Sequence, residues 1–252
     1  MTDYSSLIRE IFSENGLDGL LNSSNVEKFN MLIDRMLTVN EKMNLTAITD
    51  GEDVILKHIA DSATVVKYIP KNAKLLDVGT GGGFPSLPVA ILRPDVSVYA
   101  LDSTAKKLNY IEETARLLSL NNIKTVCGRA EVFGKSVNYR ERFDVVTARA
   151  VASLNILTEL CLPFVKLGGT FISMKGSSAN EEITAARSGV IQLGGTKFED
   201  IEFTLHYNDK VMQRHLVISK KAKNTPDSFP EFTAVLQKSL YKRKFREFCS
   251  RF

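Results

Sequence analysis

The stretch Ala-Lys-Leu-Leu-Asp-Val-Gly-Thr-Gly-Gly-Gly, residues 73–83, decides the fold class of this chain. An apolar run ends in the acid Asp77, and glycines follow at the alternate positions Gly79, Gly81 and Gly83. A buried strand that breaks into glycines and restarts as a helix brings bare backbone beside a ligand, because glycine has no Cβ to keep the ligand away. The stretch therefore predicts a strand, a ligand-binding loop and a helix.

The residues of the loop also indicate which cofactor it binds. A dinucleotide-binding Gly-x-Gly-x-x-Gly pattern requires glycine at position 84, where this chain has Phe84. The carboxylate of Asp77 would repel a pyrophosphate, but it suits a cofactor with cationic groups, such as the ammonium and sulfonium of S-adenosylmethionine. We interpret Asp77-x-Gly79-x-Gly81-x-Gly83 as a methyl-donor loop. The alternative is an ordinary strand-turn-helix connection.

Length and composition fit one main α/β core with a small additional unit. The chain has 252 residues, and its apolar runs are all shorter than the roughly 20 residues of a membrane-spanning helix. The first six residues lack the basic and apolar segments of a signal peptide. Cys127, Cys161 and Cys249 are far apart and predict neither a disulfide framework nor a zinc site. We therefore expect a cytoplasmic protein without metal or membrane partner.

The spacing of apolar residues divides the chain into three parts. Helical periodicity predicts three N-terminal helices, over 3–15, 25–42 and 50–68. The three parts are a helical N-terminal unit, an S-adenosylmethionine-binding methyltransferase domain, and a linker followed by a basic C-terminal helix, at residues 1–72, 73–220 and 221–252.

Within the second part, strands alternate with helices, which predicts a parallel sheet covered on both faces. The expected strands are 74–78, 96–101, 123–127, 143–148 and 169–174, and the expected helices are 85–92, 104–119, 153–165 and 179–192. Two later segments, 197–207 and 211–219, predict a hairpin. The expected fold is α/β: a Rossmann-like class I S-adenosylmethionine-dependent methyltransferase with a seven-stranded, mostly parallel sheet and a helical N-terminal extension.

Two positions beyond the glycine loop are candidates for binding the nucleoside part of the cofactor. Asp102 follows the second strand, 23 residues after Gly79, where an acid can accept hydrogen bonds from ribose hydroxyls. Its alternative role is to cap the next helix. Ala130 and Glu131 follow the third strand, where backbone groups and a nearby side chain would hold an adenine ring. The alternative for Glu131 is an exposed acid at a helix start.

The end of the fourth strand, Thr147-Ala148-Arg149-Ala150, indicates the reaction by what it lacks. It has no Asn-Pro-Pro-Tyr run to grip an exocyclic amine and no Pro-Cys pair to attack a pyrimidine ring. We therefore expect a ready nucleophile such as guanine N7, which has a lone pair and no proton to lose, and no catalytic general base. Alignment and exclusion of water would supply most of the rate. Arg149 is a candidate for holding substrate or cofactor, with a structural ion pair as the alternative.

Two polar clusters lie outside this domain pattern. His58-x-x-Asp61-Ser62 shares one helix face, and a local hydrogen-bonded cluster is expected there because a metal site would need a third ligand. Residues 220–252 carry nine Lys and Arg against three Asp and Glu, a net charge of +6. The segment Lys242-Arg243-Lys244-Phe245-Arg246 would attract phosphates, or it would form a packed helix instead.

Taken together, these motifs resemble the glucose-inhibited division protein B family, bacterial 16S ribosomal RNA guanine-N7 methyltransferases. The resemblance runs from about residue 25 to 219. It rests on the ordered set Asn44-Leu45-Thr46, His58-x-x-Asp61-Ser62, Asp77-Val-Gly-Thr-Gly-x-Gly-Phe-Pro, Leu101-Asp102-Ser103, Arg129-Ala130-Glu131, Arg149-Ala150-Val-Ala-Ser-Leu154, Lys175-Gly176 and Arg214-His215-Leu216.

The resemblance implies methyl transfer from S-adenosylmethionine to N7 of one guanine in the 530 loop of 16S ribosomal RNA. The partner would be that RNA or the small ribosomal subunit, and we expect a monomer. Cofactor contacts are implied at Gly79, Phe84, Ala130, Glu131 and Arg149. The tail departs from the family, which often has Tyr-Pro-Arg where this chain has Phe-Pro-Glu at 229–231. The alternatives are a methyltransferase for another RNA, an NAD-dependent oxidoreductase and a non-catalytic RNA-binding module.

Overall fold

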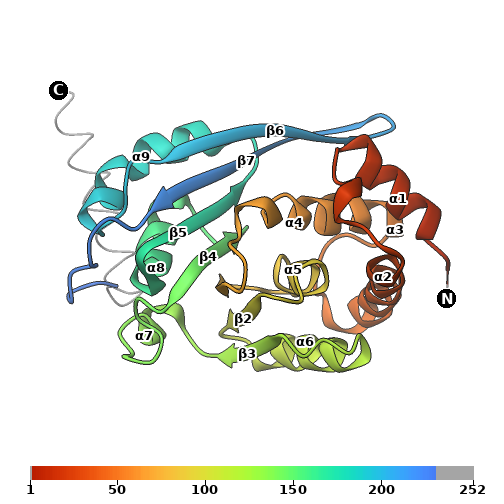
Figure 1. Cartoon of the computed structure of the whole chain (residues 1–252), viewed down its shortest axis with the longest axis horizontal. Coiled ribbons are helices and arrows are strands. Elements are labelled where there is room, and N and C mark those ends of the chain that lie inside the picture. The colour runs from red at the N-terminus through yellow and green to blue at the C-terminus, as the bar shows by residue number, and fades with distance from the viewer. Residues whose placement is uncertain (1, 231–252) are drawn as a thin grey trace.

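A sheet of seven strands forms the frame of the protein in the computed structural model, which describes residues 2–230 (Figure 1). The strands are β1 (Lys74–Val78), β2 (Ser97–Asp102), β3 (Ile123–Cys127), β4 (Phe143–Arg149), β5 (Val165–Lys175), β6 (Glu199–Tyr207) and β7 (Lys210–Lys220). They lie in the order β3-β2-β1-β4-β5-β7-β6. The first five pair in parallel, and β7 is antiparallel to β5 and β6. The predicted parallel strands with a closing hairpin are confirmed.

Alternation along β1 gives each face of the sheet its own apolar core. Leu75 belongs to the core on one face, and Leu76 belongs to the core on the other. The N-terminal helices cover the first face together with α5 and α6, and α7, α8 and α9 cover the second (Figure 1). The bounds of these five helices are Ser86–Leu92, Ala105–Leu117, Ala130–Phe133, Leu154–Cys161 and Ala179–Gln192.

The N-terminal helices belong to the same core as α5 and α6. They are α1 (Ser5–Glu14), α2 (Ser23–Met43), α3 (Gly51–Val54) and α4 (Asp61–Ala63), with a π-helical turn at Ile55–Ala60 and 3₁₀ turns at Asp18–Leu20 and Val66–Tyr68. Phe29, Leu32 and Met36 form a buried stripe at helical spacing along α2. Because these side chains join the core beside the sheet, the division of the chain at residue 72 stays a prediction.

The structure differs from the expected elements near Pro163. The expected helix 153–165 ends at Cys161, and a 3₁₀ turn that contains Pro163 follows it, because the proline ring does not fit inside a helix. The next strand, β5, begins at Val165 rather than at residue 169. The three residues after Val165 are exposed, so they lack the apolar pattern of a buried strand. The four-residue helix α7 was not among the expected helices, although a helix start was one alternative for Glu131.

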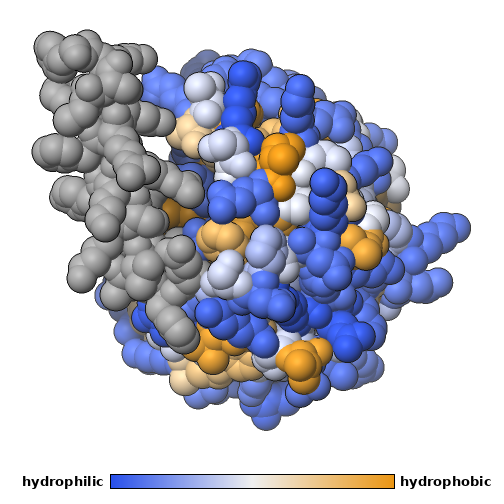
Figure 2. All heavy atoms as spheres, turned by 90° about the vertical axis from the view of Figure 1, so that its left-hand side faces the viewer, coloured by the Kyte–Doolittle hydropathy of each residue, from blue (hydrophilic) through white to orange (hydrophobic). Residues whose placement is uncertain are grey.

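On the side of the molecule seen in Figure 2, hydrophilic side chains predominate among the described residues, and the apolar areas between them are small. Single exposed apolar side chains are normal on protein surfaces. Within residues 2–230 no helix is both long and apolar enough to cross a membrane. The predicted basic C-terminal helix, with the segment 242–246, lies outside the described residues.

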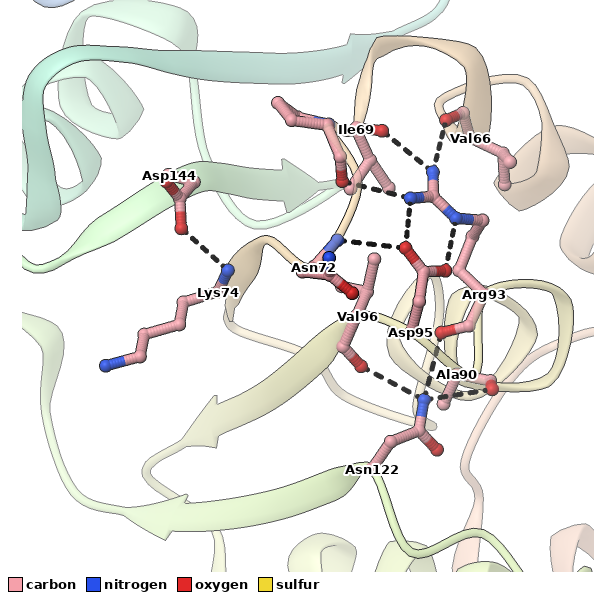
Figure 3. A network of polar contacts seen from close by, with 11 residues as sticks. Val66, Ile69, Asn72, Lys74, Ala90, Arg93, Asp95, Val96, Asn122 and Asp144 are labelled. Atoms are coloured by element: carbon pink, nitrogen blue, oxygen red, sulfur yellow. Dashed lines mark hydrogen bonds and ion pairs between the residues drawn. The ribbon is translucent and has the colours of Figure 1, made fainter.

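A polar network around Arg93 fixes the connection between the N-terminal helices and β1 (Figure 3). Arg93, just after α5, donates to the carbonyl oxygens of Ile69 at 2.7 Å and Pro70 at 2.9 Å. It also donates to both carboxylate oxygens of Asp95, each at 2.7 Å, and the amide of Asn72 donates to the same carboxylate at 3.0 Å. The guanidinium holds the pKa of Asp95 well below its usual value. One side chain thus anchors the chain that enters the sheet.

We expect Arg93→Ala to lower the free energy of unfolding by about 2–3 kcal/mol, because charged hydrogen bonds are lost and carbonyl oxygens lose their donor. Urea unfolding measures this loss. The matched control is Arg35→Ala, which removes an exposed ion pair with Glu113 and should cost less than about 1 kcal/mol. Equal losses in the two variants would show that the network does not anchor the connection.

Candidate active site

A cavity of about 530 Å³ lies at the carboxyl ends of the parallel strands. One wall comes from the ends of β1, β2 and β4 and the segments after β1 and β3, and the other from the N-terminal helices and the connection after α2. The second wall consists of Met36, Leu45, Thr46 and His58. In open α/β sheets a ligand binds in the crevice at the carboxyl edge, where neighbouring connections diverge. The position of this cavity makes it the candidate active site.

The first wall contains the glycine loop held against β2. The amide of Gly81 donates to Oδ2 of Asp102 at 3.0 Å, and the amide of Thr104 donates to Oδ1 at 2.8 Å. Asp102 therefore holds the loop to the segment that leads into α6, whereas the N-cap of α6 is Thr104, so the alternative of Asp102 as the helix cap is not observed. Each carboxylate oxygen has a further lone pair, and Asp102 lines the cavity. The carboxylate can accept additional hydrogen bonds from a ligand.

The wall continues through the segment after β3. Ala130 and Glu131 begin α7, and both line the cavity with Gly128 and Arg129. Glu131 is 6% exposed, and its carboxylate accepts from Nε of Arg129 at 2.6 Å. The alternative of an exposed acid at a helix start does not describe Glu131. Its side chain is instead buried at the cavity wall, beside the carboxyl end of the sheet.

Asp77 is the predicted contact that the structure keeps away from the cavity. It is completely buried, and its carboxylate accepts from Oγ of Ser86 at 2.7 Å and from Oγ1 of Thr147 at 3.1 Å. Alternation along β1 directs Asp77 to the same face as Leu75, beneath the start of α5. Burial raises the pKa of this carboxyl group. The geometry therefore contradicts a direct contact with a cationic cofactor group, and Asp77 instead links β1, β4 and α5.

Phe84 and Arg149 meet where the two walls join. The ring of His58 stacks on Phe84 with 4.6 Å between ring centroids, and the guanidinium of Arg149 lies 5.5 Å from the centre of the Phe84 ring. Arg149 also pairs with Asp61 at 3.0 Å. The structural ion pair that the sequence left open for Arg149 is therefore present, and the same side chain lines the cavity.

Asp61 connects Arg149 to a second strand. Its other carboxylate oxygen accepts from Nε of Arg214 on β7 at 3.3 Å. The expected cluster is thus confirmed for His58 and Asp61, with Arg149 and Arg214 as partners, but not for Ser62, whose buried hydroxyl has no hydrogen-bond partner among the described residues. Within residues 2–230 no group of three or more His, Cys, Asp and Glu is placed to hold a metal ion.

Seven of the eight predicted cofactor contacts line the same cavity, namely Gly79, Gly81, Phe84, Asp102, Ala130, Glu131 and Arg149. Reasoning on single positions did not identify Thr46, His58, Lys107 or Val151 as cavity residues. Thr46, His58 and Val151 lie in motifs of the family resemblance, and His58 also lies in the predicted polar cluster, but neither signal placed them at the cavity. No regular spacing in the sequence relates these residues to the glycine loop, so their position at the cavity could not be predicted from it.

The cavity fits a nucleoside-containing cofactor. Its volume is within the range of roughly 300–1,000 Å³ for small-molecule sites. A Cβ built on Gly81 would meet nothing closer than the Gly79 carbonyl oxygen at 3.9 Å, so the bare backbone faces open space. Together with the carboxylate of Asp102 and the buried strand ends, this is the chemistry that a ribose and an adenine require. The fold and the cavity are those of the class I S-adenosylmethionine-dependent methyltransferases, and the comparisons below decide between this cofactor and NAD.

Comparison with known proteins identifies the family. Residues 25–217 match the GidB family, described as rRNA small subunit methyltransferase G. The chain is 46% identical over 212 residues to ribosomal RNA small subunit methyltransferase G of Acetivibrio thermocellus, covering 83% of this chain and 86% of the relative. It is 40% identical over 242 residues to the Clostridium kluyveri protein of the same name, covering 94% and 98%. The chain belongs to the rRNA small subunit methyltransferase G family.

Solved structures agree on the fold. A methyltransferase from Pyrococcus furiosus superimposes with a TM-score of 0.53 at 14% identity, over 77% of this chain and 98% of that one. An S-adenosylmethionine-dependent O-methyltransferase from Thermotoga maritima gives a TM-score of 0.51 at 12% identity, over 76% and 73%. The family decides between the cofactors that the sequence left open: the protein uses S-adenosylmethionine rather than NAD.

Gly81→Ala should weaken binding of S-adenosylhomocysteine at least about tenfold, because the new methyl group enters the space beside the bare backbone. Gly168→Ala is the matched control: Gly168 has φ +76°, close to the +57° of Gly81, and open space around its Cβ position. Both variants should lose about 1–2 kcal/mol of stability from the left-handed backbone. Calorimetry measures binding and thermal unfolding measures stability. Unchanged affinity in Gly81→Ala would remove the loop from the site.

The stability of the fold should fall on acidification because of His58. Burial and the positive charge of Arg149 lower the pKa of His58 to about 3, whereas the unfolded chain protonates it near 6.5. Below pH 6.5 the unfolded state therefore binds a proton that the folded state excludes. The free energy of unfolding should drop by about 2 kcal/mol between pH 7 and pH 5.

Urea unfolding across this pH range measures the drop. His58→Asn should remove most of it, since asparagine does not titrate. His206→Asn, at an exposed position on β6, should keep it. A wild-type stability that stays flat from pH 7 to pH 5 would contradict the neutral buried state of His58.

Proposed function

We propose that this protein transfers the methyl group of S-adenosylmethionine to N7 of a guanine in the 530 loop of 16S ribosomal RNA. The observation that carries the proposal is the cavity at the carboxyl edge of the sheet, where family motifs from distant parts of the chain meet. Family membership supports an RNA of the small ribosomal subunit as the substrate. The absence of an amine-gripping run and of a Pro-Cys pair after β4 supports N7 as the acceptor.

Each wall of the cavity has its own role in this proposal. Asp102, Ala130 and Glu131 would hold the ribose and adenine, while Gly79, Gly81 and Phe84 would border the methionine part. When bound, S-adenosylmethionine supplies a methyl group on a positively charged sulfur, which a neutral nucleophile can accept. The wall of Met36, Leu45, Thr46 and His58 would then face the guanine. Leu45 already lies over the glycine loop, 3.7 Å from the Cβ position of Gly82.

The chemistry proposed for the site requires position rather than proton transfer. Guanine N7 attacks with an in-plane lone pair and loses no proton. His58 is unsuited as a general base because its Nδ1 faces the guanidinium of Arg149 at 3.0 Å and its pKa is about 3. Arg149, with donors directed at Asp61 and at the carbonyl oxygen of Lys57, would act as a positioning residue of the wall.

Methyl transfer from tritiated S-adenosylmethionine to 16S RNA, naked or in small subunits, tests the proposal. The RNA comes from cells that lack the enzyme, and the labelled nucleotide is then mapped. We expect label on N7 of one guanine in the 530 loop, and little label on RNA from cells that contain the enzyme. Label on an adenine, a protein or a small molecule would refute the assignment. We also propose a monomer in the cytoplasm, and sedimentation at micromolar concentration measures the oligomeric state.

A further inference from the structure

Thr46 is held rigidly at the cavity wall by a neighbouring asparagine. The amide of Thr46 donates to Oδ1 of Asn40 at 2.9 Å, and Nδ2 of Asn40 donates back to the carbonyl oxygen of Thr46 at 2.9 Å. Asn40 lies in the last turn of α2 and is 8% exposed. Asn44, with φ 49°, ends that helix in the left-handed conformation and turns the chain back over it. The backbone of Thr46 is therefore fixed from both sides, and Thr46 is one of the residues that line the cavity.

The hydrogen bonds around His58 determine which way its ring is protonated. Nη2 of Arg149 lies 3.0 Å from Nδ1 of His58. A guanidinium has only donors, so Nδ1 must accept. The neutral ring then carries its proton on Nε2, which lies 2.9 Å from Oγ1 of Thr46. Arg149 therefore donates to Nδ1 of His58, and the Nε2–H group of His58 donates to the hydroxyl oxygen of Thr46.

The hydroxyl of Thr46 is left with only one role. Its oxygen accepts from His58, and it also accepts from the amide of Ile48 at 3.2 Å. A hydroxyl group has two acceptor positions and one donor. Both acceptor positions are occupied by these contacts, so the group can engage a further partner only by donating its hydrogen. The wall of the cavity opposite the glycine loop thus presents a hydrogen-bond donor of fixed polarity.

A donor at this wall distinguishes the two purines. The edge of guanine that contains N7 also presents O6, and both atoms are acceptors. The same edge of adenine presents N7 as an acceptor but the N6 amino group as a donor. We propose that the Thr46 hydroxyl donates to O6 of the target guanine, and so selects guanine over adenine while it orients N7. Arg149 and His58 act as positioning residues, because they fix the polarity of that hydroxyl.

The inference rests on the proposed function, and the decisive test is a cycle of one protein change and one base change. Thr46→Val removes the hydroxyl at similar size, and 2-aminopurine in place of the target guanine removes O6 but keeps N7. The substrate is 16S RNA with this single replacement, naked or reconstituted into small subunits, whichever form the unaltered protein methylates. Rates are compared as kcat/KM for all four combinations.

The two changes should be non-additive if Thr46 contacts O6. With guanine, Thr46→Val should lower kcat/KM by about tenfold, the size of one lost neutral hydrogen bond. With 2-aminopurine, the variant and the unaltered protein should differ by less than about threefold, because the contact is already absent. Thr46→Ser, which keeps the hydroxyl, should retain the preference for guanine. Binding of S-adenosylhomocysteine should be the same in all three proteins.

The outcomes separate this inference from the proposed function. If the unaltered protein places no methyl group on guanine N7, the proposed function fails. If it does so but Thr46→Val has the same effect on both bases, the O6 contact alone is refuted. Should Thr46→Val unfold, the unaltered protein still provides a test, because equal methylation of guanine and 2-aminopurine substrates would overturn the contact. A Thr46→Ser variant that accepts adenine as well as guanine would overturn it too.

Discussion

The guanidinium of Arg149 joins the two walls of the cavity, and the geometry of the site depends on it. Arg149 is the last residue of β4, while its partners Lys57, His58 and Asp61 all belong to the helical turns before the sheet. Removal of one member of such a buried ion pair costs about 3–5 kcal/mol, because a charge is left without its partner. Asp61 is 4% exposed, and without Arg149 its buried carboxylate would keep, among the described residues, only the longer contact with Arg214 at 3.3 Å. The contact thus fixes the N-terminal helices relative to the carboxyl edge of the sheet.

Sequence patterns predicted the sheet because its signals are local. The apolar run before Gly79 and the glycines after it fixed β1 and its loop, and α9 has the bounds that its spacing indicated. Signals failed where exposure or a single residue broke the pattern. The exposed start of β5 was not predicted as part of the strand. The helix before Pro163 ends four residues before its predicted end. Local periodicity determines where elements lie, and their ends depend on contacts that it does not contain.

The site was predictable to the extent that it follows strand ends. Asp102, Ala130 and Glu131, which line the cavity, could be predicted as neighbours because connections after parallel strands meet at one edge of a sheet. Asp77 was wrongly placed at the cavity because only its position near the strand end was considered. Side chains alternate between the two faces of a strand, and this alternation directs Asp77 beneath α5. Thr46 could not be found by position at all. It reaches the cavity only because Asn44 turns the chain back and Asn40 holds it there, and no periodicity encodes that fold-back.

If the reaction requires no proton transfer, as we propose, the walls of the site contribute by holding their polar groups in place. Preorganised dipoles contribute most when they need no rearrangement as the reaction proceeds. His58 meets this condition because burial, and after it the charge of Arg149, lowers its pKa, while Arg149 also occupies Nδ1, so the ring has one charge state and one tautomer near neutral pH. A protonated His58 would have no lone pair to accept from Arg149, and the two cations would repel each other. The same contact that joins the walls therefore also sets the polarity of the Thr46 hydroxyl, the group that we propose faces the base.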